Sequence, residues 1–456
     1  MPLLDRTLAE MQRRVTFLPR EVQVWKASAD ENVDELGIHR SQFEALKILL
    51  DGLLEKQDNL LPQLSPSLPP GQFAEVYWRL VSLTAGANDL WSIFRHIIAQ
   101  HQDKLFKPLL DAADLVAADC YLTCLNQVHN WGLLEEKEYR EPPLVYLEAD
   151  ISPATASRGA RVESLGFPLH HYRDMRLPIP IVVLPFDHAE SLWLFCSLHH
   201  EVGHNLDQDL RLRSELKRQM TRRLQTESVP RERLAVWEQW VGEVLADTFG
   251  VLLGGAGFGH SMASLLLVLA PLFPDLNTGD KHPHPYVRVY LIAATLRLCG
   301  VPELTEAADL ILQSWNEGQK LPWIEPYTKD SDIVAEVFLN QPLGPLGNRA
   351  LREVVPDLAG DADRANRLAR FLSSGFNRDP DPQRLPPFSH RLVPVGAQLA
   401  IMKKDAPTSP ELDLIQERSL KYLRDIPRPE YLAGVDRRQF LHALTQELDF
   451  NLEGEE

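Results

Sequence analysis

Residues 198–207 read LHHEVGHNLD, and this stretch decides how the rest of the chain is interpreted. Apolar residues recur around it at intervals of three and four, which predicts an amphipathic helix with one face in a core. These residues are Phe195, Leu198, Val202 and Leu206. His200 and His204 lie one helical turn apart and point away from the apolar face. We therefore expect a core helix that presents two imidazoles to a cleft.

Five residues of this stretch, HEVGH, fit the pattern H-E-x-x-H. Because positions i and i+4 share one face of a helix, His200 and His204 can bind a single zinc ion, with Glu201 beside a water molecule at the ion. A catalytic zinc site also needs a third protein ligand and one open position. We expect that ligand on a second helix.

The stretch 240–250, WVGEVLADTFG, offers this ligand because it places Glu243 and Asp247 one turn apart. Glu243 can bind the metal, and Asp247 can accept the far N–H of a ligating histidine and so fix its tautomer. Such a pair is otherwise typical of a solvated acidic edge. Here it is embedded among apolar residues, where burying two carboxylates is costly without a cation. The metal interpretation is therefore favoured.

A third stretch, KHPHPYVRV at 281–289, enters the next expected helix. His282, Tyr286 and Arg288 supply donors that can stabilise the oxyanion of a tetrahedral intermediate. The alternative is an ordinary helix start with proline in its first turn.

In this order, HEVGH, GEVLAD and HPHPYVR resemble the motifs of gluzincin metallopeptidases, most of all those of the HtpX and CAAX-prenyl-protease group. The resemblance implies a zincin-like core in which three residues bind one zinc ion, with Glu201 as the general base and Asp247 as the orienting partner. The implied ligands are His200, His204 and Glu243. It also implies His282 and Arg288 near the substrate or the oxyanion. The best-known members are integral membrane proteins, whereas we expect no spanning helix here.

The expected function is zinc-dependent hydrolysis of peptide bonds in a restricted protein or peptide substrate. Residues 177–186, LPIPIVVLPF, predict an edge strand, since prolines at 178, 180 and 185 remove ladder donors, and we expect the substrate backbone to pair with it. Two alternatives stay open. One is a non-catalytic, zinc-containing helical protein that binds a partner or acts as a sensor, and the other is a helical scaffold without metal.

The predicted fold is mainly α with a small β-sheet (α+β), with helical domains flanking the zincin-like core. We expect an N-terminal helical domain over 1–135, the catalytic core over 136–300 and a C-terminal helical region over 301–456. Helices are predicted at 189–207, 210–226, 231–253, 260–269 and 286–299.

Composition narrows the class of protein. The 456 residues carry a net charge of -17, which gives no electrostatic reason to bind nucleic acid. The longest apolar stretch, 262–273, is too short to cross a membrane, and the N-terminus is too charged for a secretory signal. Four cysteines are too few for a disulfide framework, which predicts reduced core thiols and a cytoplasmic protein. The oligomeric state stays open.

Three further features receive no role. Cys196, four residues before His200, is interpreted as a buried hydrophobe rather than an inhibitory thiolate. His170 and His171 are adjacent, so their side chains diverge and cannot share a metal. The basic run 211–223 is interpreted as a solvated helix face, with a lid as the alternative.

Overall fold

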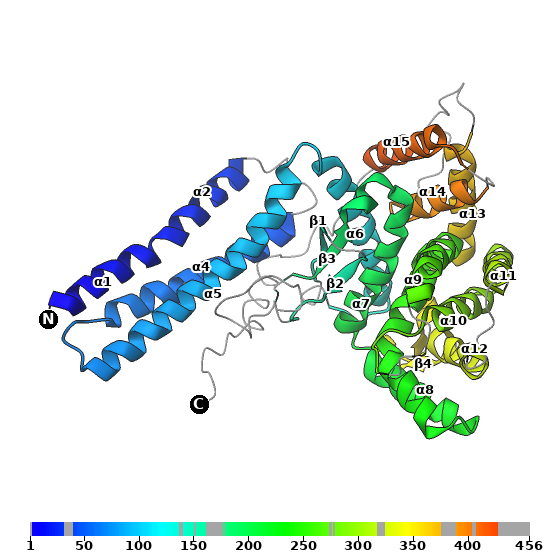
Figure 1. The fold of residues 1–456 in the computed structure, drawn as a ribbon, viewed down its shortest axis with the longest axis horizontal. Helices are drawn as coiled ribbons and strands as arrows, with labels where there is room; N and C mark the ends of the chain where they lie inside the picture. The colour runs from blue at the N-terminus through cyan, green and yellow to red at the C-terminus, as the bar shows by residue number, and fades with distance from the viewer. Residues whose placement is uncertain are drawn as a thin grey trace. The chain divides into compact units, whose positions relative to one another are not determined.

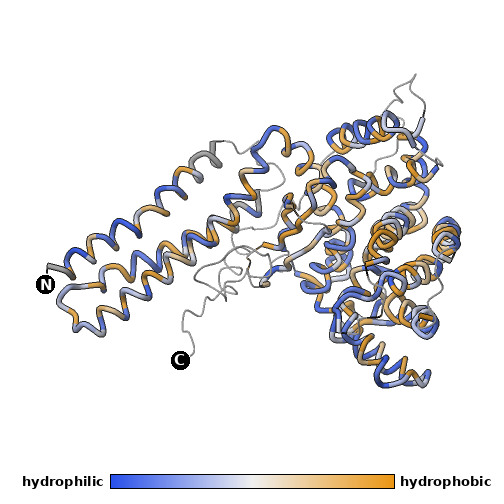
Figure 2. The backbone as a smooth tube through the Cα atoms, viewed as in Figure 1, coloured by the Kyte–Doolittle hydropathy of each residue, from blue (hydrophilic) through white to orange (hydrophobic). Residues whose placement is uncertain are grey.

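The computed structural model describes a mainly helical chain with one small sheet and a two-residue β pair, which confirms the predicted fold class (Figure 1). The residues described are 2–31, 40–135, 140–149, 152–160, 177, 179–272, 276, 279–316, 324–374, 389–403 and 407–426. Most helices carry hydrophilic and hydrophobic residues on different faces (Figure 2), so each has a side to bury.

Contacts divide the described chain into two compact units. One unit holds residues up to Asp103 with part of 156–181, and the other holds 104–155 and 182–433. The predicted domain boundaries at 135 and 300 stay a prediction, because a division by contacts does not test which segments fold alone.

The first unit consists of long helices. They are α1 (Pro2–Val15), α2 (Phe17–Glu31), α4 (Arg40–Leu60) and α5 (Pro70–Gln102), with a short 3-10 helix at Leu61–Gln63. α4 packs on α5 and α2 on α4. One of its clusters of buried apolar side chains comprises Met11, Val15, Leu60, Leu64, Phe73 and Leu80. No described residue of this unit belongs to the metal-binding group below.

The second unit contains the candidate site. Its helices are α6 (Lys107–Asn130), α7 (Ser197–Leu210), α8 (Arg213–Thr226), α9 (Arg231–Leu269), α10 (Pro285–Leu298), α11 (Pro302–Asn316), α12 (Glu325–Asn340), α13 (Leu358–Leu372), α14 (Leu392–Met402) and α15 (Ser409–Asp425). A β pair, β4 (Pro342–Leu343) with antiparallel β5 (Arg349–Ala350), and 3-10 helices at Gly344–Leu346 and Leu351–Val354 link α12 to α13.

Helix α9 is the centre of this unit, because α7, α8, α10, α11 and α14 all pack against it (Figure 1). Large side chains along α9 are fully buried, including Trp237, Trp240, Phe249 and Phe258. The helix is interrupted at Gly255, which has φ 50° and ψ -135°. The two helices predicted at 231–253 and 260–269 are therefore one element with a break inside it.

The same helix corrects the expectation that no apolar segment is long enough to cross a membrane. The helix at Arg231–Leu272 meets that criterion by length and composition, and 67% of its most apolar window is buried inside the protein. A core helix surrounded by other helices meets the same criterion, so this burial is compatible with a soluble protein.

The small sheet corrects the prediction of an edge strand at 177–186. Its order is β1 (Leu144–Glu148), β3 (Ile181–Pro185), β2 (Ala154–Ala156), so β3 lies in the middle and is buried along its whole length. Pro180 directly precedes β3 and Pro185 ends it. Prolines at the ends of a strand do not interrupt its ladder, so they are no sign of an edge.

Two predicted helix starts also differ from the structure. The segment from 189 forms 3-10 turns at Phe186–Glu190 and Leu192–Cys196, and α7 begins only at Ser197. Ser191 separates these turns with a non-helical backbone of φ -140° and ψ 75°. Arg211, with φ 56°, ends α7, so the next helix begins at Arg213 rather than at 210. The helix predicted at 286–299 is confirmed to within one residue.

Candidate metal centre

The site forms where α7 crosses α9 at very close range. A side-chain Cβ at Gly203 would lie 2.9 Å from the Cβ atom of Phe249 and 3.0 Å from the Cα atom of Ala246. Only glycine therefore permits this approach without a shift of the helices. The predicted apolar face of α7, including Leu198, Val202 and Leu206, is fully buried.

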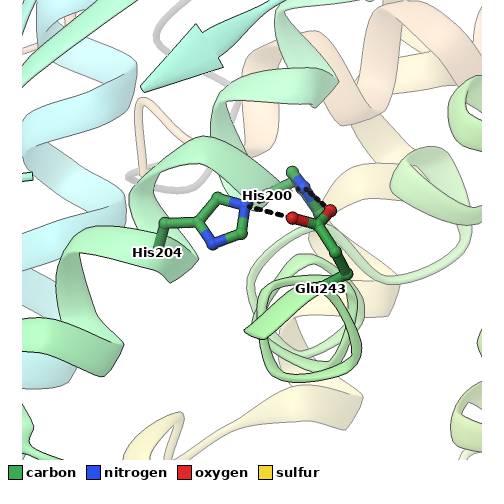
Figure 3. A group of neighbouring side chains, drawn as sticks. All are labelled: His200, His204 and Glu243. Carbon is green, nitrogen blue, oxygen red and sulfur yellow. Dashed lines mark hydrogen bonds and ion pairs between the residues drawn. The ribbon is translucent and has the colours of Figure 1, made fainter. Parts of the chain in front are cut away.

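Three side chains converge at this crossing, as the sequence predicts. His200 and His204 extend from α7, and Glu243 extends from α9 toward both (Figure 3). The Nε2 atoms of the two histidines are 3.2 Å apart. Each lies 3.5 Å from a carboxylate oxygen of Glu243. These residues form a group that could hold a metal ion, and no other described residue joins it.

The spacing of the three ligand atoms fits a small tetrahedral ion. Ligands 2.0–2.1 Å from zinc stand about 3.3–3.4 Å apart along each edge of a tetrahedron. The separation of 3.2 Å between the two imidazole nitrogens lies close to this value, and each nitrogen has a different carboxylate oxygen of Glu243 at 3.5 Å. With three protein ligands from the described residues, a fourth corner is left for water or substrate, which is the pattern of catalytic rather than structural sites.

A carboxylate and a guanidinium group contact His200 at Nδ1, the ring nitrogen that does not face Glu243. Its Nδ1 atom lies 2.8 Å from Oδ1 of Asp247. Arg288 on α10 donates to both oxygens of the same carboxylate, from Nη2 at 2.6 Å and from Nε at 2.9 Å. An Nδ1–H that donates to Asp247 leaves the Nε2 lone pair of His200 free for a metal.

Burial and charge shift the pKa values of this group strongly. Burial alone would lower the pKa of His200, but the charge and hydrogen bond of Asp247 raise it to about 10. Burial would raise the pKa of Asp247, yet the charge of Arg288 outweighs it and keeps that pKa below its ordinary value. Burial lowers the pKa of His204 to about 3. A charged cluster of this kind, buried in a helical core, is typical of functional sites.

Glu201 lies near the group, since the charges of His200 and Glu243 act on it, but it is not one of the three residues that could bind the metal. It is 6% exposed, and burial raises the pKa of its carboxyl group to about 7. A carboxylate with a pKa near neutrality can both accept and return a proton. A cation at the three ligands would oppose this rise.

The structure separates the three residues predicted to stabilise an oxyanion. His282 lies at the site, with its Nε2 atom 3.7 Å from Glu243 and its Nδ1 atom 3.2 Å from Asp280. Its side chain is 48% exposed, so it stands on the open side of the group. Arg288 stands behind His200, on the side away from the ligand atoms.

Tyr286 is placed differently from His282. Its ring packs edge-on against Trp315 at 4.8 Å and stacks with His284 at 5.7 Å. His284 caps α10 by accepting a hydrogen bond from the Tyr286 backbone N–H. The described contacts of Tyr286 are therefore those of a packing residue, and its catalytic role stays a prediction.

Features without an assigned role are also located. All four cysteines are free and buried, which confirms the prediction of core thiols. Residues 211–223 lie mostly in α8, where several basic side chains are exposed. His170 and His171 lie outside the described residues. The residue that sequence reasoning missed is Gly203, although its place inside HEVGH was visible.

No family model matches this sequence, and searches of curated proteins and of solved structures find no similar protein.

Proposed function

We propose that this chain is a zinc-dependent metallopeptidase of the gluzincin type, with one zinc ion per chain. The observation that carries the proposal is the position of Glu243. Its carboxylate comes from a helix different from that of the two histidines and still lies 3.5 Å from each of them. Two imidazoles and one carboxylate form a donor set that suits zinc.

The chemistry expected of this site is hydrolysis. A zinc ion bound there would supply a Lewis acid that polarises a carbonyl group and makes water more acidic. Glu201 takes the proton from the attacking water and delivers it to the leaving amine nitrogen. Asp247 and Arg288 hold His200 in one tautomer throughout. His282, which is half-exposed and 3.7 Å from Glu243, would donate to the carbonyl group of the substrate.

The proposed substrate is a protein or peptide rather than a nucleic acid, because the chain carries a net charge of -17. Strand β2 replaces β3 as the place where a substrate backbone could pair. It is the outer strand on the side of α7, since Asn205 donates to the Thr155 hydroxyl at 3.1 Å. An outer strand offers unpaired backbone groups to an extended peptide. A cytoplasmic location agrees with four free, buried cysteines.

The test compares the wild type with Glu201→Gln. We expect both proteins to bind one zinc ion per chain, measured by elemental analysis. Cleavage of a mixed peptide library, followed by mass spectrometry, should fall at least 100-fold in the variant, because a glutamine cannot accept the proton.

Equal zinc content without cleavage by the wild type would instead support a non-catalytic, zinc-containing protein that binds a partner or acts as a sensor. A folded preparation without zinc, even after zinc is added, would contradict the metal site altogether.

A further inference from the structure

Side chains at the metal centre become more exposed toward the C-terminal end of α7. Side-chain exposure rises from 7% at His200 to 17% at His204 and then to 58% at Arg213, the first residue of α8. Arg213 lies near this exposed end of the site, since its charge acts on His204 and its guanidinium group lies against Gly242, the residue before Glu243.

Arg213 is held in place by a buried carboxylate. Asp207, three residues after His204, is 3% exposed and accepts two hydrogen bonds from Arg213. The backbone N–H donates to Oδ1 at 2.9 Å, and the side-chain Nε donates to Oδ2 at 2.6 Å. An exposed arginine usually moves among several rotamers, whereas two bonds to one buried carboxylate fix both ends of this residue.

A glycine on α9 makes room for the guanidinium group. A Cβ atom at Gly242 would lie 2.9 Å from Nη2 and 3.0 Å from Cζ of Arg213. The guanidinium group therefore lies against the backbone of α9 at the residue directly before the ligand Glu243. Any larger residue at position 242 would displace it, so α7 and α9 together position this cation beside the ligands.

The outer edge of the guanidinium group is available to a ligand. Asp207 takes the Nε–H, and among the described residues no side chain pairs with Nη1 or Nη2. Arginine recognises carboxylates through such N–H groups, and a fixed guanidinium loses little entropy on binding. In a chain of net charge -17, a cation held at this position is a local attractor for anions.

We propose that Arg213 is a specificity-determining residue that binds a carboxylate of the substrate next to the scissile bond. The carboxylate is either the C-terminal group of a peptide or an acidic side chain. This inference rests on the proposed peptidase function, and it gives that site a preference for acidic or free-ended peptides.

The test measures binding in the Glu201→Gln background, so that the substrate is not consumed. Three mixtures of fluorescent hexapeptides are compared. The first two contain only neutral residues and end in a free carboxylate or in an amide. The third ends in an amide and contains one glutamate at varied positions. Fluorescence anisotropy gives the affinities. A charged hydrogen-bonded pair favours its ligand by about 10- to 100-fold, so we expect at least one carboxylate mixture to bind that much more tightly than the amide.

Arg213→Met should abolish this preference, and Arg213→Lys should keep part of it. Arg218→Met is the matched control, because Arg218 is exposed and lies five residues along α8, about 140° around the helix. It should leave the ratio of affinities unchanged. The free-carboxylate and glutamate mixtures distinguish the two sources of the carboxylate.

Two outcomes would overturn the inference. One is an equal loss of affinity for all three mixtures in Arg213→Met, which is what a merely structural role predicts. The other is that the Glu201→Gln protein with Arg213 intact shows no preference for a carboxylate mixture, including the case in which no mixture binds. Cleavage by zinc-loaded protein with active Glu201 is scored separately: carboxylate-selective binding without any cleavage contradicts the peptidase, whereas cleavage with an unchanged preference in Arg213→Met contradicts only the role of Arg213.

Discussion

Arg288 with Asp247 and Arg391 with Asp361 are two arginine–aspartate pairs with little exposure in the same unit. In the first pair, the aspartate has a second donor, the ring of His200. In the second pair, the arginine has further acceptors. It donates from Nη1 to the backbone oxygen of Leu253 at 2.7 Å, just before the break in α9. The first pair therefore orients an imidazole, and the second supplies a hydrogen-bond donor to a backbone oxygen next to the break in α9.

The neighbouring histidines of α7 face these two pairs separately. His200 lies on Asp247, while the Nε2 atom of His199 lies 2.9 Å from the backbone oxygen of Arg391 and its Nδ1 atom lies 2.9 Å from that of Cys196. Burial lowers the pKa of His199 to about 4. Two adjacent, chemically identical side chains thus have different surroundings, because one lies against a carboxylate and the other against two backbone oxygens.

Removing one member of the second pair should give the largest effect on stability. Arg391→Met leaves the Oδ2 atom of Asp361 and the Leu253 oxygen without the donor that Arg391 supplies, and breaking a buried pair costs about 3–5 kcal/mol. Denaturant unfolding measures the loss. We expect the zinc content of the folded fraction to stay at one per chain.

Arg364→Gln is the control for this prediction. Arg364 also pairs with Asp361 but is 30% exposed, so its loss should cost under about 1 kcal/mol. Equal costs for the two variants would show that Arg391 has no special place at the helix break.

Removing the carboxylate of the first pair should act on the metal. In Asp247→Asn the acceptor of the His200 N–H is weakened, and loss of such a partner lowers metal affinity about 10- to 100-fold. Competition with a chromophoric chelator measures this affinity. Asp330→Asn is the matched control, because Asp330 is also a buried aspartate paired with an arginine. Its partner is Arg233, whose Nε atom lies 2.6 Å from Oδ2, and neither residue belongs to the metal-binding group.

The control should lose stability and keep its zinc affinity. An affinity loss of the same size in Asp330→Asn would mean that general destabilisation explains both results, and that the two kinds of pair do not differ in function.

Gly203→Ala should affect both properties to an intermediate degree. The added methyl group must separate α7 from α9, and overpacking of this kind costs about 1–3 kcal/mol. Because the ligands come from these two helices, zinc affinity should fall as well. Gly52→Ala on α4, where a Cβ meets nothing within 4 Å, should instead stabilise its helix slightly. An unchanged zinc affinity in Gly203→Ala would show that the helix spacing does not limit the site.

Metal removal should lower the stability of the wild type by an amount that depends on its zinc affinity. A ligand present at 100 times its dissociation constant stabilises the folded state by about 2.7 kcal/mol. Chelation should lower the melting temperature accordingly, and calorimetry with and without zinc measures it. Asp247→Asn should show a smaller zinc-dependent shift than Arg391→Met. The reverse order would contradict the assignment of the two pairs.

The sequence predicted the three candidate ligands better than the contacts that position them. His200 and His204 follow from helical spacing, because residues one turn apart share a face whatever the fold around them. Glu243 was predicted for a different reason, since a carboxylate embedded in an apolar segment is costly without a cation. The partner of Arg288 could not be predicted, since its contact with Asp247 spans 41 residues and depends on how α10 packs. The strand order was missed for the same reason: prolines mark where β3 ends but not which strands flank it.

His200 and His204 come from consecutive turns of α7, and Glu243 and Asp247 come from consecutive turns of α9. Each pair is carried by one rigid rod, so neither can adjust its internal spacing. The positions of the ligand atoms then depend on how the two helices are placed relative to each other, including the distance between them where Gly203 meets Ala246. A compound or mutation far from the ligands that widens this distance by a fraction of an ångström would lower the affinity for the ion without contacting the site.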